Sequence, residues 1–524
     1  MTTTRAVWIF ILVLTALRLA LLNATQLSPD EAYYWMWAQR PALSYFSKGP
    51  GVAFVIRTST AIFGDNEFGV RFWSPFLAAG TSLLLYYFAQ RLFSSLAAFW
   101  TVMVLNLTPI FNLGSLVMTI DPLSIFFWVA AFYTFWLALE RSPDFSWWWP
   151  LTGLLIGLGF LCKFTNALEL ISILLVLLLT RRLRREFRRP NLYLLLVVFA
   201  LATIPPILWN ADHAWITLAH LKSRGSLDHA PGFHPLELLS FLAAHFGTYS
   251  PLLFLGLVWA TVASWRRAQQ NFKVLFLLWF GLPVFILYTL LSFNKAAAPN
   301  WDGLAFLSLA ILAVSYWRER AASRTAAYHW TNVAVILALL MSALLVGLMV
   351  NPVGFDRRGH DPSDRLRGWA ALGRAAGKVR ADFEQSSGQR VFMIADERDR
   401  ATELAFYLPD KRVEGPSHPP VYIPESQDMV NQFSFWPRYD EFVPLSATVQ
   451  RAPDEVYTEE EGVNLFAGRT ALYFQLGKKG RPPRNIRNAF GRTEQIATIE
   501  VHAGTRLLRE IQVFACYDYR TMPL

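Results

Sequence analysis

Two patterns of hydrophobic and polar residues divide the chain near residue 350. Before that point, long apolar runs alternate with short polar breaks, and a helix needs about 20 apolar residues to cross a bilayer. The pattern therefore predicts about eleven transmembrane helices, and hence a polytopic α-helical membrane protein whose residues 1–350 form the transmembrane domain. The predicted helices cover residues 6–24, 70–90, 95–113, 121–140, 149–162, 164–180, 191–210, 236–264, 273–293, 302–317 and 329–350.

After Asn351 the pattern becomes that of a water-exposed domain. Residues 390–396 (RVFMIAD) predict a buried strand, and residues 397–408 predict a helix with one apolar face. Residues 471–477 and the alternating residues 506–517 predict two further strands. We therefore expect residues 351–524 to form a small α/β domain.

Basic residues mark the loops on one face of the predicted bundle. Alternate loops carry the excess of lysine and arginine, which in membrane proteins marks the cytoplasmic side. These residues are Arg5, Arg91, Arg141, the run 181–189, Arg266, Arg267, Lys273, Arg318, Arg320 and Arg324. The N-terminus is thus predicted to be cytoplasmic, and an odd number of spans places the C-terminal domain outside the cytoplasm.

Composition narrows the class of protein further. Charged residues make up 16% of the chain, well below the roughly 25% of soluble domains. The net charge of +10 lies in short loops between apolar runs, which indicates membrane topology and not nucleic-acid binding. The two cysteines, Cys162 and Cys516, fall in different domains, and His213 and His245 lack partners at metal-ligand spacing. We therefore predict no disulfide framework and no required metal, with a divalent metal left as an alternative.

The loops of the opposite face carry charges at the membrane boundary, where an idle charge is costly. They are Asp30, Glu31, Lys48, Asp121, Asp212, His213, Arg224, Lys295 and Asp302. Solvation of a loop explains any one of them alone, and Asp121 before Pro122 is also a good helix start. Their shared face makes this the first place to look for chemistry.

Several motifs together resemble a known family. In chain order they are DEAYYW (30–35), YFSKGP (45–50), FGDNEFGVRF (63–72), MTIDPLSIFFW (118–128), PNWD (299–302), ELAFYLP (403–409) and NQFSFWP (431–437). This set resembles the bacterial GT-C glycosyltransferases of the protein-mannosyltransferase and aminoarabinose-transferase type. The resemblance implies an inverting enzyme of the bacterial inner membrane with a periplasmic C-terminal domain. Its donor would be a polyprenyl-phosphate-linked sugar, and its acceptor a hydroxyl of an envelope lipid, a glycan or a protein.

The resemblance also implies roles for the acidic residues. Asp30 best matches the family's catalytic base, Glu31 is the close competitor, and a structural role for both is the alternative. Asp121 is a second candidate catalytic residue, which would orient the acceptor or a loop. Tyr33, Tyr34, Asn300 and Trp301 are candidate contacts for the sugar or acceptor, although interfacial packing and turn chemistry also explain them.

Four basic residues are candidates for the donor phosphate: Lys48, Arg71, Arg224 and Lys295. Lys48 matches a family lysine that is often followed by two prolines. Here the segment is KGPG, and the lost proline predicts a looser loop. Snorkelling to the interface is the alternative for Arg71. We interpret Lys163, between two apolar runs, as a helix-boundary residue first.

Two other classes of protein remain as alternatives. A transporter or flippase of lipid-linked substrates would show internal repeats and charges in broken helices near the midplane. A structural subunit would not need Asp30, Asp121 and Lys48 on one face. The sequence shows no convincing repeat, and the family resemblance is the main reason why the glycosyltransferase is the preferred interpretation.

Overall fold

The computed structural model describes residues 2–225, 232–351, 362–444 and 462–521. The chain forms two compact units. The first contains residues 1–24 and 41–351, and the second contains residues 25–40 and 352–524. Residues 25–40 carry helix α2 (Pro29–Ala38), which a single boundary near residue 350 would assign to the transmembrane part.

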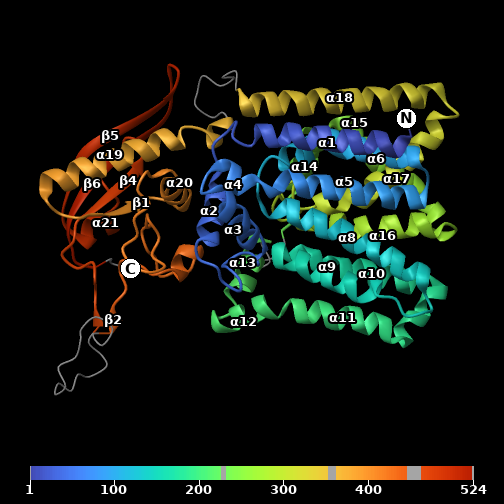
Figure 1. Ribbon diagram of the computed structural model, residues 1–524, viewed down its shortest axis with the longest axis horizontal. Coiled ribbons are helices and arrows are strands. Elements are labelled where there is room, and N and C mark those ends of the chain that lie inside the picture. Colours follow the sequence, from blue (N-terminus) through green and yellow to red (C-terminus); the bar gives the residue numbers. More distant parts are fainter. Residues whose placement is uncertain (1, 226–231, 352–361, 445–461, 522–524) are drawn as a thin grey trace. The chain divides into compact units, whose positions relative to one another are not determined.

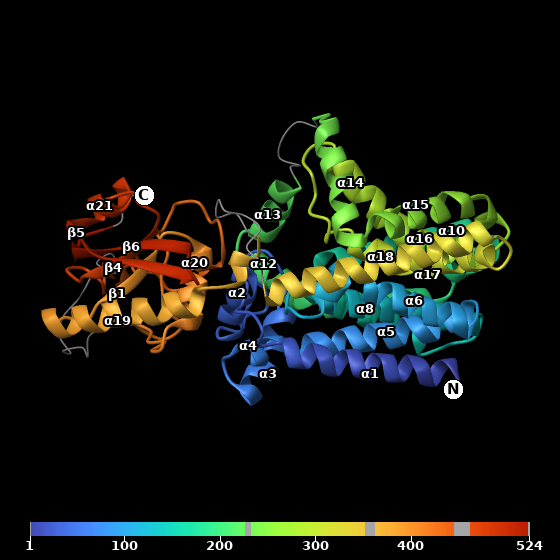
Figure 2. The ribbon, with the colours of Figure 1, turned by 90° about the horizontal axis from the view of Figure 1, so that it is seen from above.

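The first unit is helical, and its long helices run side by side in both Figure 1 and Figure 2. Its α-helices from the N-terminus to the middle of the chain are α1 (Thr3–Leu21), α3 (Gly51–Phe63), α4 (Glu67–Arg71), α5 (Trp73–Leu92), α6 (Ser95–Leu107), α7 (Pro109–Gly114), α8 (Ile120–Arg141), α9 (Trp148–Cys162) and α10 (Leu168–Leu179). The later ones are α11 (Pro190–Ala202), α12 (Ile204–Asp212), α13 (Ile216–Arg224), α14 (Pro235–Tyr249), α15 (Pro251–Ser264), α16 (Phe272–Leu291), α17 (Gly303–Ala321) and α18 (Thr325–Val350).

Burial separates the central helices of this unit from the peripheral ones. In α8, 72% of the most apolar window is buried, whereas the value is 22% for α1 and for α18. The exposed faces of α1 and α18 carry large apolar side chains where a water-soluble protein would have polar ones. Among them are Leu12, Leu17, Leu340 and Leu344. Such a continuous apolar exterior requires lipid around it, so the unit is a polytopic helical membrane domain.

The number of spans follows less directly from the helices. Among the described residues, four helices (α1, α8, α16 and α18) are long and apolar enough to cross a membrane. The number rises to seven if each of three bent helix pairs is one span. The count of about eleven therefore stays a prediction.

Three predicted helices are wrong as continuous elements. The run 191–210 is divided at Thr203 into α11 and α12, with a bend of 44°. The run 236–264 is divided into α14 and α15, which meet at an angle of 114° where Ser250 has φ +72°. The run 95–113 is divided into α6 and α7 at Thr108, which is extended. A proline directly follows the breaks at Ser250 and Thr108, and the residue before a proline is driven out of the helical region. A prediction from hydrophobicity alone does not detect helix breaks of this kind.

The second unit is built on a mixed four-stranded sheet of order β1-β4-β6-β5. Strand β1 (Phe392–Ala395) pairs in parallel with β4 (Ala471–Leu476), with Phe392 opposite Ala471. Strand β6 (Arg506–Tyr519) pairs antiparallel with β4 and with β5 (Phe490–Ala503). A small second sheet joins β2 (Val443–Pro444) to β3 (Gly462–Val463). The segments predicted as strands at residues 390–396 and 471–477 contain β1 and β4, and the segment 506–517 covers all but the last two residues of β6. Strand β5 was not predicted.

Helices α2, α19 (Trp369–Ser387), α20 (Arg398–Tyr407) and α21 (Arg484–Ala489) complete this unit. Helix α19 packs on β5 and α20, and α20 also packs on α2. The predicted helix at 397–408 corresponds to α20.

Candidate functional site

Asp121 lies at the start of α8 and is held by side chains from two other helix ends. Thr119 caps the helix, with its hydroxyl accepting a hydrogen bond from the Asp121 amide. Lys163 Nζ lies 2.8 Å from Asp121 Oδ1, and Asn300 Nδ2 donates to Asp121 Oδ2 at 3.0 Å. Both carboxylate oxygens are therefore occupied. Segments that are 42 and 179 residues away from Asp121 supply these donors.

Lys163 combines a helix boundary with a charge contact. It is the C-cap of α9, where the backbone leaves the helix in an extended conformation. Its side chain is 9% exposed, so the ammonium group is buried beside the Asp121 carboxylate. A buried lysine and aspartate at this distance satisfy each other's charge, which neither would tolerate alone.

The loop that carries Lys48 is packed tightly against the end of α9. The carbonyl of Lys48 accepts hydrogen bonds from the Tyr45 amide and the Ser44 hydroxyl. A Cβ added at Gly49 would lie 2.3 Å from the Leu161 carbonyl oxygen, and one at Gly51 would lie 2.5 Å from Cys162 Sγ. The prediction of a looser loop is therefore wrong. The glycines of KGPG permit a close backbone approach that proline at position 49 would not.

This packing brings Lys48 into the electrostatic environment of both Asp121 and His220. His220, on α13, contacts the Phe46 ring with a centroid distance of 4.7 Å. Burial, together with the nearby charges of Lys48 and Arg224, lowers the pKa of His220 to about 4. The imidazole is consequently neutral at neutral pH and available for hydrogen bonding.

Arg224 and Trp301 form a second contact in this part of the unit. The Arg224 guanidinium lies over the Trp301 ring at 5.2 Å, and Trp301 packs edge-on against Tyr288. The sequence-predicted residues Lys48, Asp121, Arg224, Asn300 and Trp301 are thus linked through direct contacts or electrostatic interactions. The cluster presents the exposed Arg224 and the half-buried Lys48 and Trp301 near a carboxylate that is already paired.

Two predicted phosphate ligands lie outside this cluster of contacts. Arg71 is fully buried, and its guanidinium donates to the Leu22 carbonyl near the end of α1, at 2.9 Å. It therefore does not snorkel to a surface. Lys295 is exposed and makes no ion pair with any described residue.

The other predicted acids lie on α2 of the second unit. Asp30 has a side chain that is 53% exposed, and it pairs with Arg398 at 3.4 Å. Glu31 is fully buried, and its carboxylate accepts hydrogen bonds from the amide and hydroxyl of Ser28 in a capping box. Glu31 thus has a structural task at the start of α2, whereas Asp30 presents an accessible carboxylate.

Tyr33 and Tyr34 are buried within the second unit. The Tyr33 oxygen accepts a hydrogen bond from the Gln432 amide at 2.6 Å, and its ring stacks on Phe433. Tyr34 packs edge-on against Trp37. The NQFSFWP segment therefore packs on α2, and Tyr33 at 2% exposure is committed to that packing.

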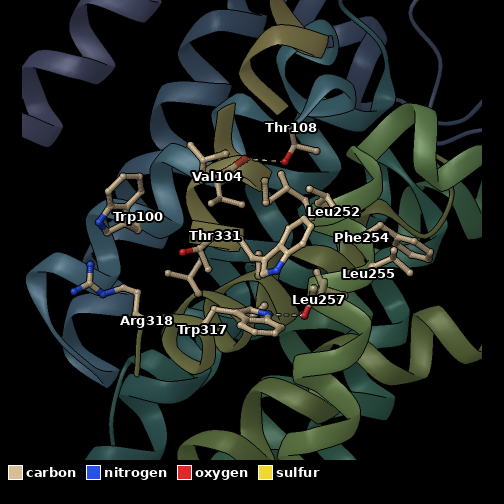
Figure 3. A pocket seen from close by; sticks show the side chains of 18 of the residues that line it. Trp100, Val104, Thr108, Leu252, Phe254, Leu255, Leu257, Trp317, Arg318 and Thr331 are labelled. Carbon is tan, nitrogen blue, oxygen red and sulfur yellow. Dashed lines mark hydrogen bonds between the residues drawn. The ribbon is translucent and has the colours of Figure 1, made fainter. Parts of the chain in front are cut away.

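An apolar cavity of about 560 Å³ lies in the first unit among α6, α15, α17 and α18 (Figure 3). Its walls include Trp100, Leu252, Phe306, Ala310 and Trp317. The lining residues of α17 begin at Phe306 and continue past Arg318, so at 1.5 Å per residue the cavity follows most of the helix. Tyr249 also lines it, and Tyr249 lies within the electrostatic influence of Asp121.

Known proteins match this chain in both sequence and fold. The family model for dolichyl-phosphate-mannose-protein mannosyltransferases matches residues 47–209. Lipid A galacturonosyltransferase RgtD of Rhizobium johnstonii is 27% identical over 422 residues, which cover 80% of this chain and 86% of that protein. The undecaprenyl phosphate-α-4-amino-4-deoxy-L-arabinose arabinosyl transferase of Erwinia tasmaniensis is 27% identical, and the alignment covers 62% of each chain.

The fold comparison covers nearly the whole chain. The crystal structure of ArnT from Cupriavidus metallidurans bound to undecaprenyl phosphate matches with a TM-score of 0.62, at 17% identity and 98% coverage of both chains. The chain is similar in sequence and fold to GT-C glycosyltransferases of the aminoarabinose-transferase-like family, and the matches together support a glycosyltransferase of this type. It is therefore a sugar-transferring enzyme, and the flippase and structural-subunit alternatives fall away.

Two residues of this glycosyltransferase's cluster were not among the predicted site residues. Lys163 was interpreted as a helix boundary, although its charge between two apolar runs was the signal for a buried partner. His220 had no signal in the sequence, because only the fold brings α13 beside Phe46 and Lys48. The matched region 47–209 contains Lys48, Asp121 and Lys163 but neither His220 nor Asn300.

Proposed function

We propose that this glycosyltransferase moves a sugar from a polyprenyl-phosphate donor to a hydroxyl of a lipid A-type glycolipid. The observation that carries the proposal is the cluster of Asp121, Lys163, Asn300, Lys48 and Arg224 in the same helical unit as a long apolar cavity. A lipid-linked sugar phosphate needs both a cationic site and an apolar channel. The relatives' activities, lipid A modification and transfer from undecaprenyl phosphate, support the same substrate classes.

In this proposal Lys48 and Arg224 bind the donor phosphate. The phosphate becomes the leaving group when the bond to the anomeric carbon breaks, and negative charge develops on its oxygens. Preorganised cations stabilise that charge more in the transition state than in the ground state. Lys163 is occupied by Asp121, so its main task is to keep Asp121 and the adjoining turn in place.

Asp30 is the proposed base that removes the proton from the acceptor hydroxyl. General-base catalysis contributes about 10²–10⁴-fold and requires a carboxylate with a free oxygen. Glu31 is buried in its capping box, and both oxygens of Asp121 accept hydrogen bonds. Asp30, exposed on α2, is the best suited of the three. Attack of the activated hydroxyl opposite the leaving phosphate inverts the anomeric centre.

The prenyl chain of the donor is proposed to occupy the apolar cavity along α17. Burial of a CH₂ group in such a site stabilises the complex by about 0.8 kcal/mol. Tyr249 lines the cavity and interacts electrostatically with Asp121, which supports placing the phosphate at the Tyr249 end of the chain.

For the sugar, we propose an anionic uronic acid in preference to a cationic amino sugar. Lys48 and Arg224 are basic, while the carboxylate of Asp121 is already neutralised by Lys163. The residual charge of the cluster therefore favours an anion. Lys163 neutralises the Asp121 carboxylate, which a divalent metal would otherwise do. We therefore also propose that turnover needs no metal.

The orientation is proposed from the basic loops, with a cytoplasmic N-terminus, about eleven spans and a periplasmic C-terminal unit. This arrangement would carry the transfer out at the outer face of the inner membrane, where lipid A-type acceptors meet a lipid-linked donor.

The test is a transfer assay with purified protein, lipid A and a panel of undecaprenyl-phosphate-linked sugars, with and without EDTA. The proposal predicts that a uronic acid appears on lipid A, by mass spectrometry, with EDTA causing no loss. Transfer of aminoarabinose alone would contradict the proposed sugar, and transfer only to glycans or peptides would contradict the acceptor. Movement of intact donor across a vesicle membrane without sugar release would contradict the enzyme mechanism.

A further inference from the structure

His245 and Asp302 form a buried pair in the first unit, and Asp302 is two residues after Asn300 of the Asp121 cluster. His245 Nε2 lies 2.9 Å from Asp302 Oδ2, and both side chains are fully buried. His245 Nδ1 lies 2.7 Å from the Phe241 carbonyl, which can only accept a hydrogen bond. Nδ1 therefore carries a proton, and a second proton is shared between Nε2 and the Asp302 carboxyl. Both ring nitrogens are committed, so the imidazole has a fixed orientation.

Aromatic rings hold this imidazole in place. Phe254, Tyr249 and Phe306 stack on His245 with centroid distances of 4.9, 5.3 and 5.7 Å, and Phe241 packs edge-on at 4.6 Å. A histidine enclosed in this way does not reach a substrate. His245 can therefore affect the reaction only through Asp302, the residue that it holds.

Asp302 belongs to the turn formed by residues 299–302. Asp302 precedes α17, and two residues before it Asn300 donates to Asp121 Oδ2 at 3.0 Å. At the other end of the turn the Tyr249 hydroxyl donates to the Pro299 carbonyl at 3.2 Å. The turn is thus anchored from α14 at both ends, by His245 and by Tyr249.

We propose that His245 is a positioning residue that fixes the 299–302 turn and thereby holds Asn300 on Asp121. Tyr249 is the second anchor of the same turn. The inference adds to the proposed function two anchors of the turn that carries Asn300: His245, which is enclosed by aromatic rings, and Tyr249, which also lines the apolar cavity. Without the His245 anchor the turn shifts, the Asn300 amide leaves Asp121, and the carboxylate is held by Lys163 alone.

Two substitutions at one position separate this role from a merely structural one. In His245→Gln the side-chain amide reaches the position of Nε2 and retains a donor to Asp302. In His245→Asn the shorter amide retains only the contact at the position of Nδ1. We expect His245→Gln to keep kcat within about threefold of the parent, and His245→Asn to lose at least about tenfold, since misplacement of about 1 Å in a catalytic site costs up to 10²-fold. The KM for the donor should change less than about twofold in both.

A double-mutant cycle with Asn300→Ala then identifies the route of the effect. If His245 acts through Asn300, His245→Asn lowers kcat little further once Asn300 is alanine. Tyr249→Phe, which removes only the hydroxyl, should show the same lack of additivity and serves if His245→Asn does not fold. Fully multiplicative losses in both cycles, or an equal loss in His245→Gln and His245→Asn, would overturn the proposal.

The readouts are release of undecaprenyl phosphate from a sugar-loaded donor and binding of undecaprenyl phosphate alone. Turnover by the parent protein tests the proposed function, whereas only the ratios among variants test the positioning pair. A parent without turnover refutes the donor class. An active parent with an unchanged His245→Asn variant refutes the role of His245.

Discussion

At the scale of single residues, the Asp121–Lys163 pair is an example of how a charge is kept at the end of an apolar bundle. Asp121 and Lys163 each lie at the edge of an apolar run, and this position predicts a residue at a helix end. Both are helix-end residues, at the start of α8 and at the C-cap of α9. Their pairing was not predictable, because it depends on how α8 and α9 pack against each other.

Loss of the Lys163 charge should be costly to activity. Lys163→Met keeps the length of the side chain but leaves the mostly buried Asp121 with the Asn300 amide as its partner. Removal of one member of a buried pair costs about 3–5 kcal/mol, which corresponds to at least about 100-fold in turnover if the strain falls on the catalytic state. Initial rates of undecaprenyl phosphate release measure this effect.

Lys295→Met is the matched control for that substitution. Lys295 is exposed and close in sequence to Asn300, and it forms no ion pair with the described residues. Its replacement should change turnover by less than about threefold, as is usual for an exposed charge. A larger loss in Lys295→Met than in Lys163→Met would mean that the phosphate role predicted for Lys295 is correct and that Lys163 is secondary.

Glu425, in the second unit, should make local stability depend on pH. Burial, together with the nearby carboxylates of Asp440 and Glu441, raises its pKa to about 8, and Arg438 acts in the opposite direction. Between its ordinary value near 4.5 and 8 the unfolded chain releases this proton while the folded chain retains it. Stability therefore falls as pH rises through that window and is fully present below it.

Glu425→Gln should remove this dependence. Hydrogen exchange of the β4 amides in the full chain is the measurement, with Glu441→Gln, an exposed neighbour, as control. We expect Glu425→Gln to slow exchange at pH 8 by an amount equivalent to about 1–4 kcal/mol, and to have little effect near pH 5. Equal pH profiles for the parent and Glu425→Gln would show that Glu425 ionises normally.

At the scale of elements, apolar run length predicted where helices occur but not where they break. Ser250-Pro251 and Thr108-Pro109 interrupt runs that are mostly apolar, and the prolines were the available signal. The KGPG loop shows the opposite error. The missing proline predicted a looser loop, whereas the glycines allow the backbone to pack on Leu161 and Cys162.

Gly49→Ala tests the consequence of that packing for Lys48. The new Cβ would lie 2.3 Å from the Leu161 carbonyl oxygen, so the loop must move and take Lys48 with it. We expect the KM for the lipid-linked donor to rise at least about tenfold. Gly247→Ala on α14, where a Cβ would meet nothing within 4 Å, should leave KM unchanged. Similar KM values for the two variants would contradict the tight placement of Lys48.

At the scale of the whole molecule, the division into a membrane domain and a polar C-terminal part followed from composition and pattern. The assignment of α2 to the second unit did not, since α2 is joined to that unit by side chains such as Tyr33, Gln432 and Phe433. Those contacts span about 400 positions of sequence. The cavity along α17 was likewise beyond prediction, because residues from widely separated parts of the chain, from α6 to α18, line it.

The cavity can be tested with donors of different chain length. Ala310→Trp should fill part of it and raise the KM for an undecaprenyl donor about tenfold, because a large side chain displaces buried methylene contacts. A short-chain prenyl donor should be affected less than about twofold. Leu344→Trp, on the exposed face of α18, is the control. An equal effect of Ala310→Trp on both donors would show that the chain does not lie in this cavity.

The most direct test of the account is release of undecaprenyl phosphate by the parent, Asp30→Asn and Glu31→Gln proteins under identical conditions. The account predicts turnover by the parent and a loss of at least about 10²-fold in Asp30→Asn with donor binding intact. Glu31→Gln should instead lower stability by about 1 kcal/mol through its capping box and retain most activity. Full activity of Asp30→Asn would contradict the assignment of the base, and absence of release by the parent with every sugar donor would contradict the proposed reaction itself.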